Sequence, residues 1–210
     1  MHTETFLERT WLVQAFVPAV VVSGPPASGK STFAALLRER LRWPLISKDA
    51  IKEQLFDALG WRDREWSRSL SLASYALMFS WAQELAAARM PFILEGNFRP
   101  GAHDGAFQSL TQMGVRWIQV FCTAQRSVLV RRFVERAHRA SRHPGHVDLQ
   151  SIDEIEAELL HAPLQPIAIQ SQLLQLETTQ LDSIRTAQLI EQISSAVGVY
   201  AYPDAGHNGP

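Results

Sequence analysis

Short apolar runs alternate along the chain with longer stretches in which apolar residues recur every three or four positions. The short runs predict strands, because the strands of a buried parallel sheet are apolar on both faces. The longer stretches have the period of an amphipathic helix. The pattern predicts strands at residues 18–22, 45–46, 91–94, 115–121 and 173–177, and helices at residues 30–42, 50–59, 64–89 (one helix or two), 104–113, 125–139, 151–161 and 182–197.

Strands and helices follow one another in turn, which is typical of an α/β fold with a parallel sheet and helices on both faces. Two capping boxes, Thr5 with Glu8 and Ser151 with Glu154, predict the starts of a short N-terminal helix and of the helix at 151–161. Ligand sites in such sheets lie at the carboxyl ends of the strands. Polar and catalytic residue types follow four of the predicted strands, at residues 24–31, 47–49, 95–99 and 123–126.

The length of 210 residues suits a single domain, which we place at residues 1–202, followed by a flexible tail at residues 203–210. Residues 139–148 are rich in Arg, His, Pro and Gly, which predicts a mobile loop. Together with the helix before it, this loop predicts a lid at about residues 132–150.

Composition and charge disfavour several classes of function and location. Twenty Lys and Arg against 21 Asp and Glu give a net charge of −1, which disfavours a strongly basic nucleic-acid binder but leaves room for a local basic groove. The single cysteine, Cys122, excludes an intrachain disulfide and a cysteine-based zinc site. The start lacks a signal-peptide pattern and the longest apolar run, residues 15–22, is too short for a membrane span, so a cytoplasmic protein is expected.

The strongest motif lies between the first strand and the first long helix and has the phosphate-loop pattern G-x-x-x-x-G-K-S. Its glycines allow backbone N–H groups to turn toward an anion, and the following helix adds its positive dipole end. Lys30 is expected to contact the β- and γ-phosphates and to act in catalysis, and the Ser31 hydroxyl is expected to bind Mg²⁺. A chance turn is the alternative, and the flanking strand and helix argue against it. We assign nucleotide binding to Gly24, Pro25, Pro26, Ala27, Ser28, Gly29, Lys30, Ser31, Thr32 and Arg126.

Two acidic residues follow the second and third strands. Asp49 could accept a proton from an attacking hydroxyl, or it could only cap the helix that follows. Glu95 is expected to bind a metal-bound water or a substrate hydroxyl, and we assign it to the metal site with Ser31. Asn97 and Arg99 come next and are candidate substrate contacts, with a solvated turn as the alternative reading.

Arginines dominate the start of the predicted lid. Arg132, Arg136 and Arg139 recur at i, i+4 and i+7, so they share one side of a helix. Guanidinium groups on a closing lid stabilise charge on a transferring phosphoryl group. A solvated cationic face is the alternative. With a phosphate loop present, we assign catalytic roles to Arg132 and Arg136.

Taken together, these segments resemble the AAA_33-type phosphate-loop kinases over about residues 20–197. The resemblance rests on the phosphate loop, Ser47-Lys48-Asp49, Leu94-Glu95-Gly96-Asn97-Phe98, and Arg132 and Arg136 followed by Arg142-His143-Pro144-Gly145-His146. This group is similar to polynucleotide 5′-kinase, chloramphenicol phosphotransferase and the zeta toxins. The resemblance implies a three-layer fold with five parallel strands in the order 2-3-1-4-5, Asp49 as base, lid arginines on phosphates, and Thr178 and Thr179 beside adenine.

These features predict an ATP- and Mg²⁺-dependent kinase that transfers the γ-phosphoryl group to a hydroxyl of a small molecule. ATP is favoured over GTP because the chain has no Asn-Lys-x-Asp signature. Two alternatives stay open, because family likeness does not identify the acceptor. One is a polynucleotide 5′-hydroxyl kinase, and the other is a nucleotide-dependent binding module that has no acceptor.

Overall fold

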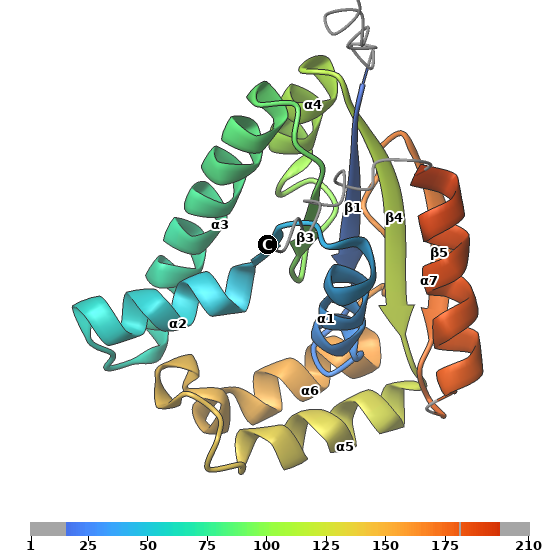
Figure 1. The fold of residues 1–210 in the computed structure, drawn as a ribbon. Helices are drawn as coiled ribbons and strands as arrows, with labels where there is room; N and C mark the ends of the chain where they lie inside the picture. Colours follow the sequence, from blue (N-terminus) through green and yellow to red (C-terminus); the bar gives the residue numbers. More distant parts are fainter. Residues whose placement is uncertain (1–15, 181, 198–210) are drawn as a thin grey trace, which may run out of the picture.

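A parallel five-stranded sheet forms the centre of the protein. The computed structural model describes residues 16–180 and 182–197 (Figure 1). The strands are β1 (Val17–Ser23), β2 (Leu45–Ser47), β3 (Phe92–Glu95), β4 (Val115–Thr123) and β5 (Ser171–Glu177), in the spatial order β2-β3-β1-β4-β5. This arrangement confirms the predicted sheet and its strand order.

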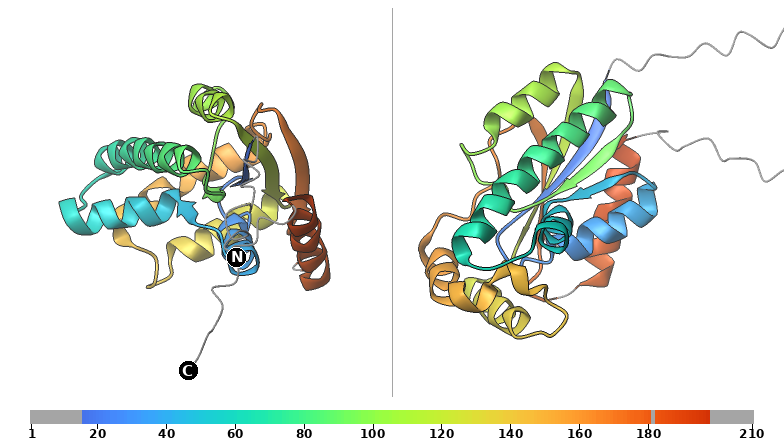
Figure 2. Two further views of the ribbon diagram at one scale, coloured as in Figure 1. Left: turned by 45° about the horizontal axis from the view of Figure 1, so that its top comes forward. Right: turned by 90° about the vertical axis from the view of Figure 1, so that its left-hand side faces the viewer.

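Helices cover both faces of the sheet and produce three layers (Figures 1 and 2). One face packs on α1 and α7, through a core that includes Val20, Val22, Phe33 and Ile193. The opposite face packs on α3 and α4, through a core that includes Met78. The helices are α1 (Lys30–Leu41), α2 (Lys48–Leu59), α3 (Arg64–Ala87), α4 (Asp104–Gln112), α5 (Arg126–Ala137), α6 (Ile152–His161) and α7 (Ser183–Val197), with short 3₁₀ helices η1 (Pro144–His146) and η2 (Asp148–Ser151).

The central strand explains why the first apolar run is continuous. All seven residues of β1 are buried, because β3 and β4 pair on its two edges and helices cover both of its faces. Gln119 in the neighbouring β4 is also buried, and its amide is satisfied by Ile167 and by the Ser171 hydroxyl. Its Oε1 accepts from Ile167 N (2.9 Å) and its Nε2 donates to Ile167 O (3.1 Å). Gln119 therefore fixes the position of the backbone at Ile167, in the segment that leads into β5.

Several local expectations need correction or completion. The stretch at 64–89 is the single helix α3, not two helices. The Ser151 capping box does not form, because the Ser151 hydroxyl donates to the carbonyls of Val147 and Asp148 instead of accepting from the α6 backbone. Glu154 instead forms ion pairs with arginines of α3. The Thr5–Glu8 box and the tail at 203–210 lie outside the described residues.

The lid at about 132–150 contains regular structure. It comprises the second half of α5, the turn η1 and most of η2. α5 packs on α6 around Leu129, Phe133 and Leu159. In the parts of the chain that the structure describes, no helix has both the length and the apolar character required to cross a membrane.

Candidate active site

The phosphate loop connects β1 to α1 with a backbone that two glycines make possible. Gly24 has φ +145°, and a Cβ there would lie 2.1 Å from the Cys122 carbonyl oxygen. Gly29 has φ +81° and is the residue before α1. Lys30 is buried, and its Nζ donates to Pro25 O (3.4 Å) across the loop. The ammonium group therefore lies over the loop whose amides are expected to hold phosphates.

Ser31 and Glu95 meet at the end of the sheet, as a shared metal site requires. Ser31 Oγ donates to Glu95 Oε1 (3.0 Å), and Ser47 Oγ donates to Glu95 Oε2 (2.6 Å). The Glu95 side chain is buried with these two neutral donors. Hydroxyl and carboxylate oxygens are the donors that Mg²⁺ prefers, and such sites complete the ion's shell with water and substrate phosphates. The residues present therefore fit a magnesium ion.

Asp49 lies in the first turn of α2, and the cap of that helix is Ser47. Ser47 has extended backbone and its Oγ accepts from Ala50 N (3.5 Å), so the alternative reading of Asp49 as the N-cap is wrong. Asp49 Oδ1 instead accepts from Lys48 Nζ (3.1 Å), and Asp49 Oδ2 lies 3.8 Å from Arg142 Nη1. The Asp49 carboxylate is thus directed at cations from α2 and from the lid.

These cations control the charge state of Asp49. Burial alone would raise the pKa of Asp49, but the neighbouring cations, Lys48 foremost, hold this pKa well below its usual range. The carboxylate is therefore ionised at neutral pH and can accept a hydrogen bond from a hydroxyl. Its weak basicity suits a group that orients the hydroxyl and takes the proton late, as a loose phosphoryl-transfer transition state needs.

The lid arginines occupy different places. Arg136 is mostly buried, and its Nε has no hydrogen-bond partner among the described residues. Burial, followed by the charge of Arg142, lowers the pKa of Arg136. Arg142 Nε donates to Asp148 Oδ2 (2.8 Å), and Arg142 Nη1 faces Asp49. Arg142 is therefore the lid arginine beside the candidate base, a role that the sequence did not assign to it.

Arg132 instead holds the turn after β5. Its guanidinium donates to Thr178 Oγ1 (3.1 Å), Thr178 O (2.7 Å) and Thr179 O (3.3 Å). Thr178 Oγ1 also donates to Ser28 O (3.1 Å), so this turn is tied to the phosphate loop. Arg132 thus joins the lid to the turn that the resemblance places beside adenine.

Two further arginines of the sequence prediction have protein partners. Arg126 donates to the carbonyl oxygens of Leu159 and Ala162 at the end of α6. Arg99 donates to both carboxylate oxygens of Glu158 (2.8 Å each). In this structure both guanidinium groups therefore join elements of the fold, and a ligand would have to displace these partners.

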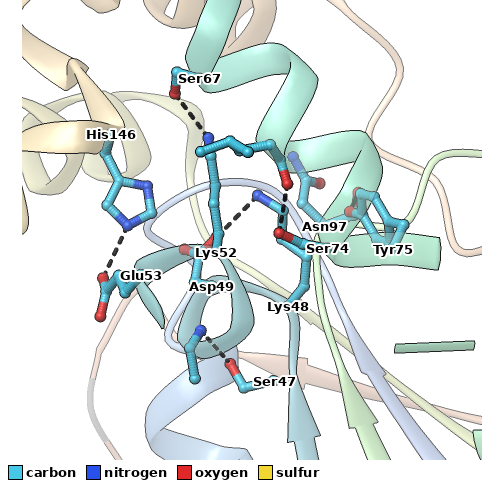
Figure 3. A network of polar contacts seen from close by, with 12 residues as sticks. Ser47, Lys48, Asp49, Lys52, Glu53, Ser67, Ser74, Tyr75, Asn97 and His146 are labelled. Carbon is cyan, nitrogen blue, oxygen red and sulfur yellow. Dashed lines mark hydrogen bonds and ion pairs between the residues drawn. The ribbon is translucent and has the colours of Figure 1, made fainter. Parts of the chain in front are cut away.

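Lys48, Lys52 and Tyr75 extend the site beyond the residues that the sequence indicated (Figure 3). Lys52 is buried, and its Nζ donates to Ser67 Oγ (2.8 Å) on α3. Tyr75 Oη donates to the backbone oxygen of Asn97 (2.8 Å). Lys48 and Lys52 lie in the same helix as Asp49, on the side that α3 covers. In the sequence, the positive charges of Lys48 and Lys52 close to Asp49 were the signal that could have indicated their place in the site.

Two cavities lie at this end of the sheet. One, of about 320 Å³, borders the start of the phosphate loop and the β3–α4 connection. The other, of about 540 Å³, borders the turn after β5. The first is lined by residues that include Gly24, Asn97, Phe98, Arg99, Phe121 and Leu164, and the second by residues that include Thr123, Gln125, Thr179, Asp182 and Arg185.

Comparisons with known proteins agree with this geometry. A family model for AAA_33, described as an AAA domain, matches residues 20–160. A kinase candidate from Chloroflexus aurantiacus is 34% identical, with 86% of this chain and 97% of that chain covered and a TM-score of 0.78. Shikimate kinase from Bacteroides thetaiotaomicron is 20% identical, with 86% and 98% covered and a TM-score of 0.50, and shares the fold. No curated protein matches the chain. The chain therefore belongs to the AAA_33 family and has the fold of the phosphate-loop kinases.

Proposed function

We propose that this protein is an ATP- and Mg²⁺-dependent kinase that transfers the γ-phosphoryl group of ATP to a hydroxyl group of a small molecule. The observation that carries the proposal is the position of Asp49. Its ionised carboxylate lies between Lys48 and the lid residue Arg142, on the helix that begins directly after a strand end next to Glu95. A module that only binds a nucleotide needs no such carboxylate.

The chain supplies separate groups for the phosphates and for the metal. Lys30 and the amides of the phosphate loop would hold the β- and γ-phosphates, with the Arg136 guanidinium available to the transferring group. Ser31 and Glu95 would hold Mg²⁺, directly or through water. When bound, the ion supplies positive charge that offsets the charge of the phosphate oxygens.

The acceptor hydroxyl would donate its hydrogen bond to the Asp49 carboxylate, which orients the oxygen lone pair toward the γ-phosphorus. The bond from the acceptor oxygen to phosphorus forms as the bond to the β,γ-bridging oxygen breaks, and ADP leaves with the electron pair. The acceptor proton passes to Asp49. Lys48 and Arg142 keep this carboxylate oriented and ionised before transfer.

The surroundings favour a small acceptor. The cavity of about 320 Å³ is lined by Asn97 and Arg99, the two predicted substrate contacts, and has the size of a pocket for a small ligand. Arg99, the candidate start of a basic groove for a polynucleotide, is neutralised by Glu158. The acceptor is therefore expected to be a compact hydroxyl compound, with the polynucleotide kinase and the binding module as outcomes of the test.

The test is ATP turnover with a panel of acceptors: sugars, hydroxy acids, nucleosides, aminoglycosides and 5′-hydroxyl oligonucleotides, with the product identified by mass spectrometry. Asp49→Asn should keep ATP affinity and lose about 10²–10⁴-fold in transfer rate. Asp63→Asn is the matched control, because Asp63 is an exposed cap of α3 whose side chain can still accept from Trp66 N.

Three results would decide the function. Phosphorylation of one small-molecule class, lost in Asp49→Asn and kept in Asp63→Asn, supports the proposal. Phosphorylation of oligonucleotides alone, with steep salt dependence, would identify a polynucleotide kinase instead. Tight ATP binding that no acceptor converts to turnover would identify a binding module.

A further inference from the structure

The lid is docked on α2 through two histidine–carboxylate contacts on either side of Phe56. His143 Nε2 lies 3.2 Å from Asp57 Oδ1, and His146 Nε2 lies 2.8 Å from Glu53 Oε1. The Phe56 ring stacks on His143 (ring centroids 5.1 Å apart) and meets His146 edge-on (5.5 Å). Glu53 and Asp57, one helical turn apart on α2, therefore contact the two histidines of a single turn of the lid.

The His143–Asp57 and His146–Glu53 contacts differ in whether a cation of the site lies next to the carboxylate. Asp57 is an exposed carboxylate with no cation of the site next to it. Glu53 Oε1, by contrast, lies 3.6 Å from Arg142 Nη1 as well as beside His146. The same Nη1 faces Asp49 Oδ2 at 3.8 Å. Only the His146 contact therefore reaches the group that faces the candidate base.

The guanidinium of Arg142 is held from two sides. Asp148 Oδ2 accepts from Arg142 Nε (2.8 Å) on one side, and Glu53 lies against Nη1 on the other. The Arg142 side chain is only 15% exposed, so few other positions are open to it. Because Glu53 belongs to α2 and Asp148 to the lid, the orientation of Arg142 depends on how these two elements are docked.

The protonation state of His146 lets it orient Glu53 without neutralising it. Burial lowers the pKa of His146 to about 4, so its ring is neutral at neutral pH. We assign the proton to Nε2, because the Glu53 carboxylate can only accept. The Glu53 charge is then available to Arg142, whereas a charged imidazolium would compete with Arg142 for the same oxygen.

We propose that His146 and Glu53 are positioning residues that hold Arg142 at Asp49, so that docking of the lid on α2 completes the site for phosphoryl transfer. The inference rests on the proposed kinase function, in which Asp49 receives the acceptor hydroxyl. It extends that function by assigning a role to a lid histidine that would touch neither ATP nor acceptor.

The first test compares three variants. His146→Leu keeps apolar packing against Phe56 but loses the donor to Glu53, and it should lower kcat about 10- to 100-fold while the ATP dissociation constant stays within about twofold. His146→Gln retains an N–H donor at a similar position and should recover most of the rate. His143→Leu removes the outer contact to Asp57, the acceptor for Gly145 N and the ring stacked on Phe56, but it leaves the His146–Glu53 contact in place, so it should keep kcat within about threefold.

The second test does not depend on turnover. The readout is the Arg142 Nη–H signal in a nitrogen-resolved NMR spectrum at low temperature, because Glu53 lies against Nη1 whereas Nε donates to Asp148 of the lid. This signal, assigned through its loss in Arg142→Lys, should be protected from exchange in the wild type and in His143→Leu. It should lose that protection in His146→Leu.

The outcomes separate this inference from the proposed function. Wild-type kcat in His146→Leu, or equal losses in both leucine variants, would show that the histidines only anchor the lid. Failure of the glutamine variant to recover the rate would also overturn the inference. If no acceptor raises wild-type ATP turnover, the proposed function fails, and the Arg142 signal alone decides whether His146 positions that side chain.

Discussion

Gly145→Ala is a sharp test of lid docking, because one added methyl group meets a rigid neighbour. A Cβ at Gly145 would lie 2.5 Å from Phe56 Cγ and 2.6–2.8 Å from both Cδ atoms. Carbon atoms in contact normally stand about 3.5–4.0 Å apart. The lid would therefore have to retreat by about 1 Å, since Phe56 is buried and its ring is stacked on His143.

The loss of stability caused by this clash depends on whether the chain keeps the overpacked contact or undocks the lid. Forcing an extra carbon into a packed site costs about 1–3 kcal/mol. The chain can limit that cost by undocking the lid, which gives up the His143 and His146 contacts with α2. We expect the melting temperature to fall by roughly 2–4 °C for each kcal/mol lost, and acceptor-dependent kcat to fall while ATP binding is kept.

Calorimetry, ATP titration and hydrogen exchange of residues 142–151 would measure these effects. Gly105→Ala is the matched control, because a Cβ at Gly105 in α4 would have no neighbour within 4 Å. That control should keep its kcat and gain up to about 1 kcal/mol of stability from the better helix propensity of alanine. Equal melting temperatures and equal kcat for Gly145→Ala and the wild type would refute the packing argument.

Two further predictions concern buried polar groups. Gln119→Leu leaves the N–H of Ile167 without its partner, whereas the Ile167 carbonyl still accepts from Ile169 N (3.0 Å). Urea unfolding should therefore show a loss of about 1–3 kcal/mol for Gln119→Leu and little change for exposed Gln112→Leu; equal effects would contradict this. Burial lowers the pKa of Lys52 from 10.5 to about 7, so the unfolded chain binds the extra proton between these values and stability should rise with pH across that window. Lys52→Met should flatten this rise between about pH 7 and about pH 10.5, and an unchanged slope would exclude Lys52 as its source.

The strands, the phosphate loop and the order of the sheet could be predicted from the sequence, because they depend mainly on residues that are near one another along the chain. The apolar run at residues 18–22 is typical of a strand covered on both faces, and the glycines and Lys30 after it carry their phosphate-loop geometry within a few residues. Strand–helix alternation and right-handed crossovers then restrict the sheet to few arrangements. The meeting of Ser31 with Glu95 follows from that arrangement. Glu95 ends β3, and the phosphate loop after the neighbouring β1 brings Ser31, in the first turn of α1, to the same edge of the sheet.

Contacts between distant segments decided the rest. Periodicity placed Arg132 and Arg136 on one side of a helix, but only the packed structure shows that Arg132 holds Thr178 and that Arg142 reaches Asp49. A long side chain can reach several partners from one helical position, and its choice depends on what tertiary packing brings within about 4 Å. His146 and Glu53 lie 93 positions apart, so no local pattern could pair them, and their contact exists because the lid docks on α2.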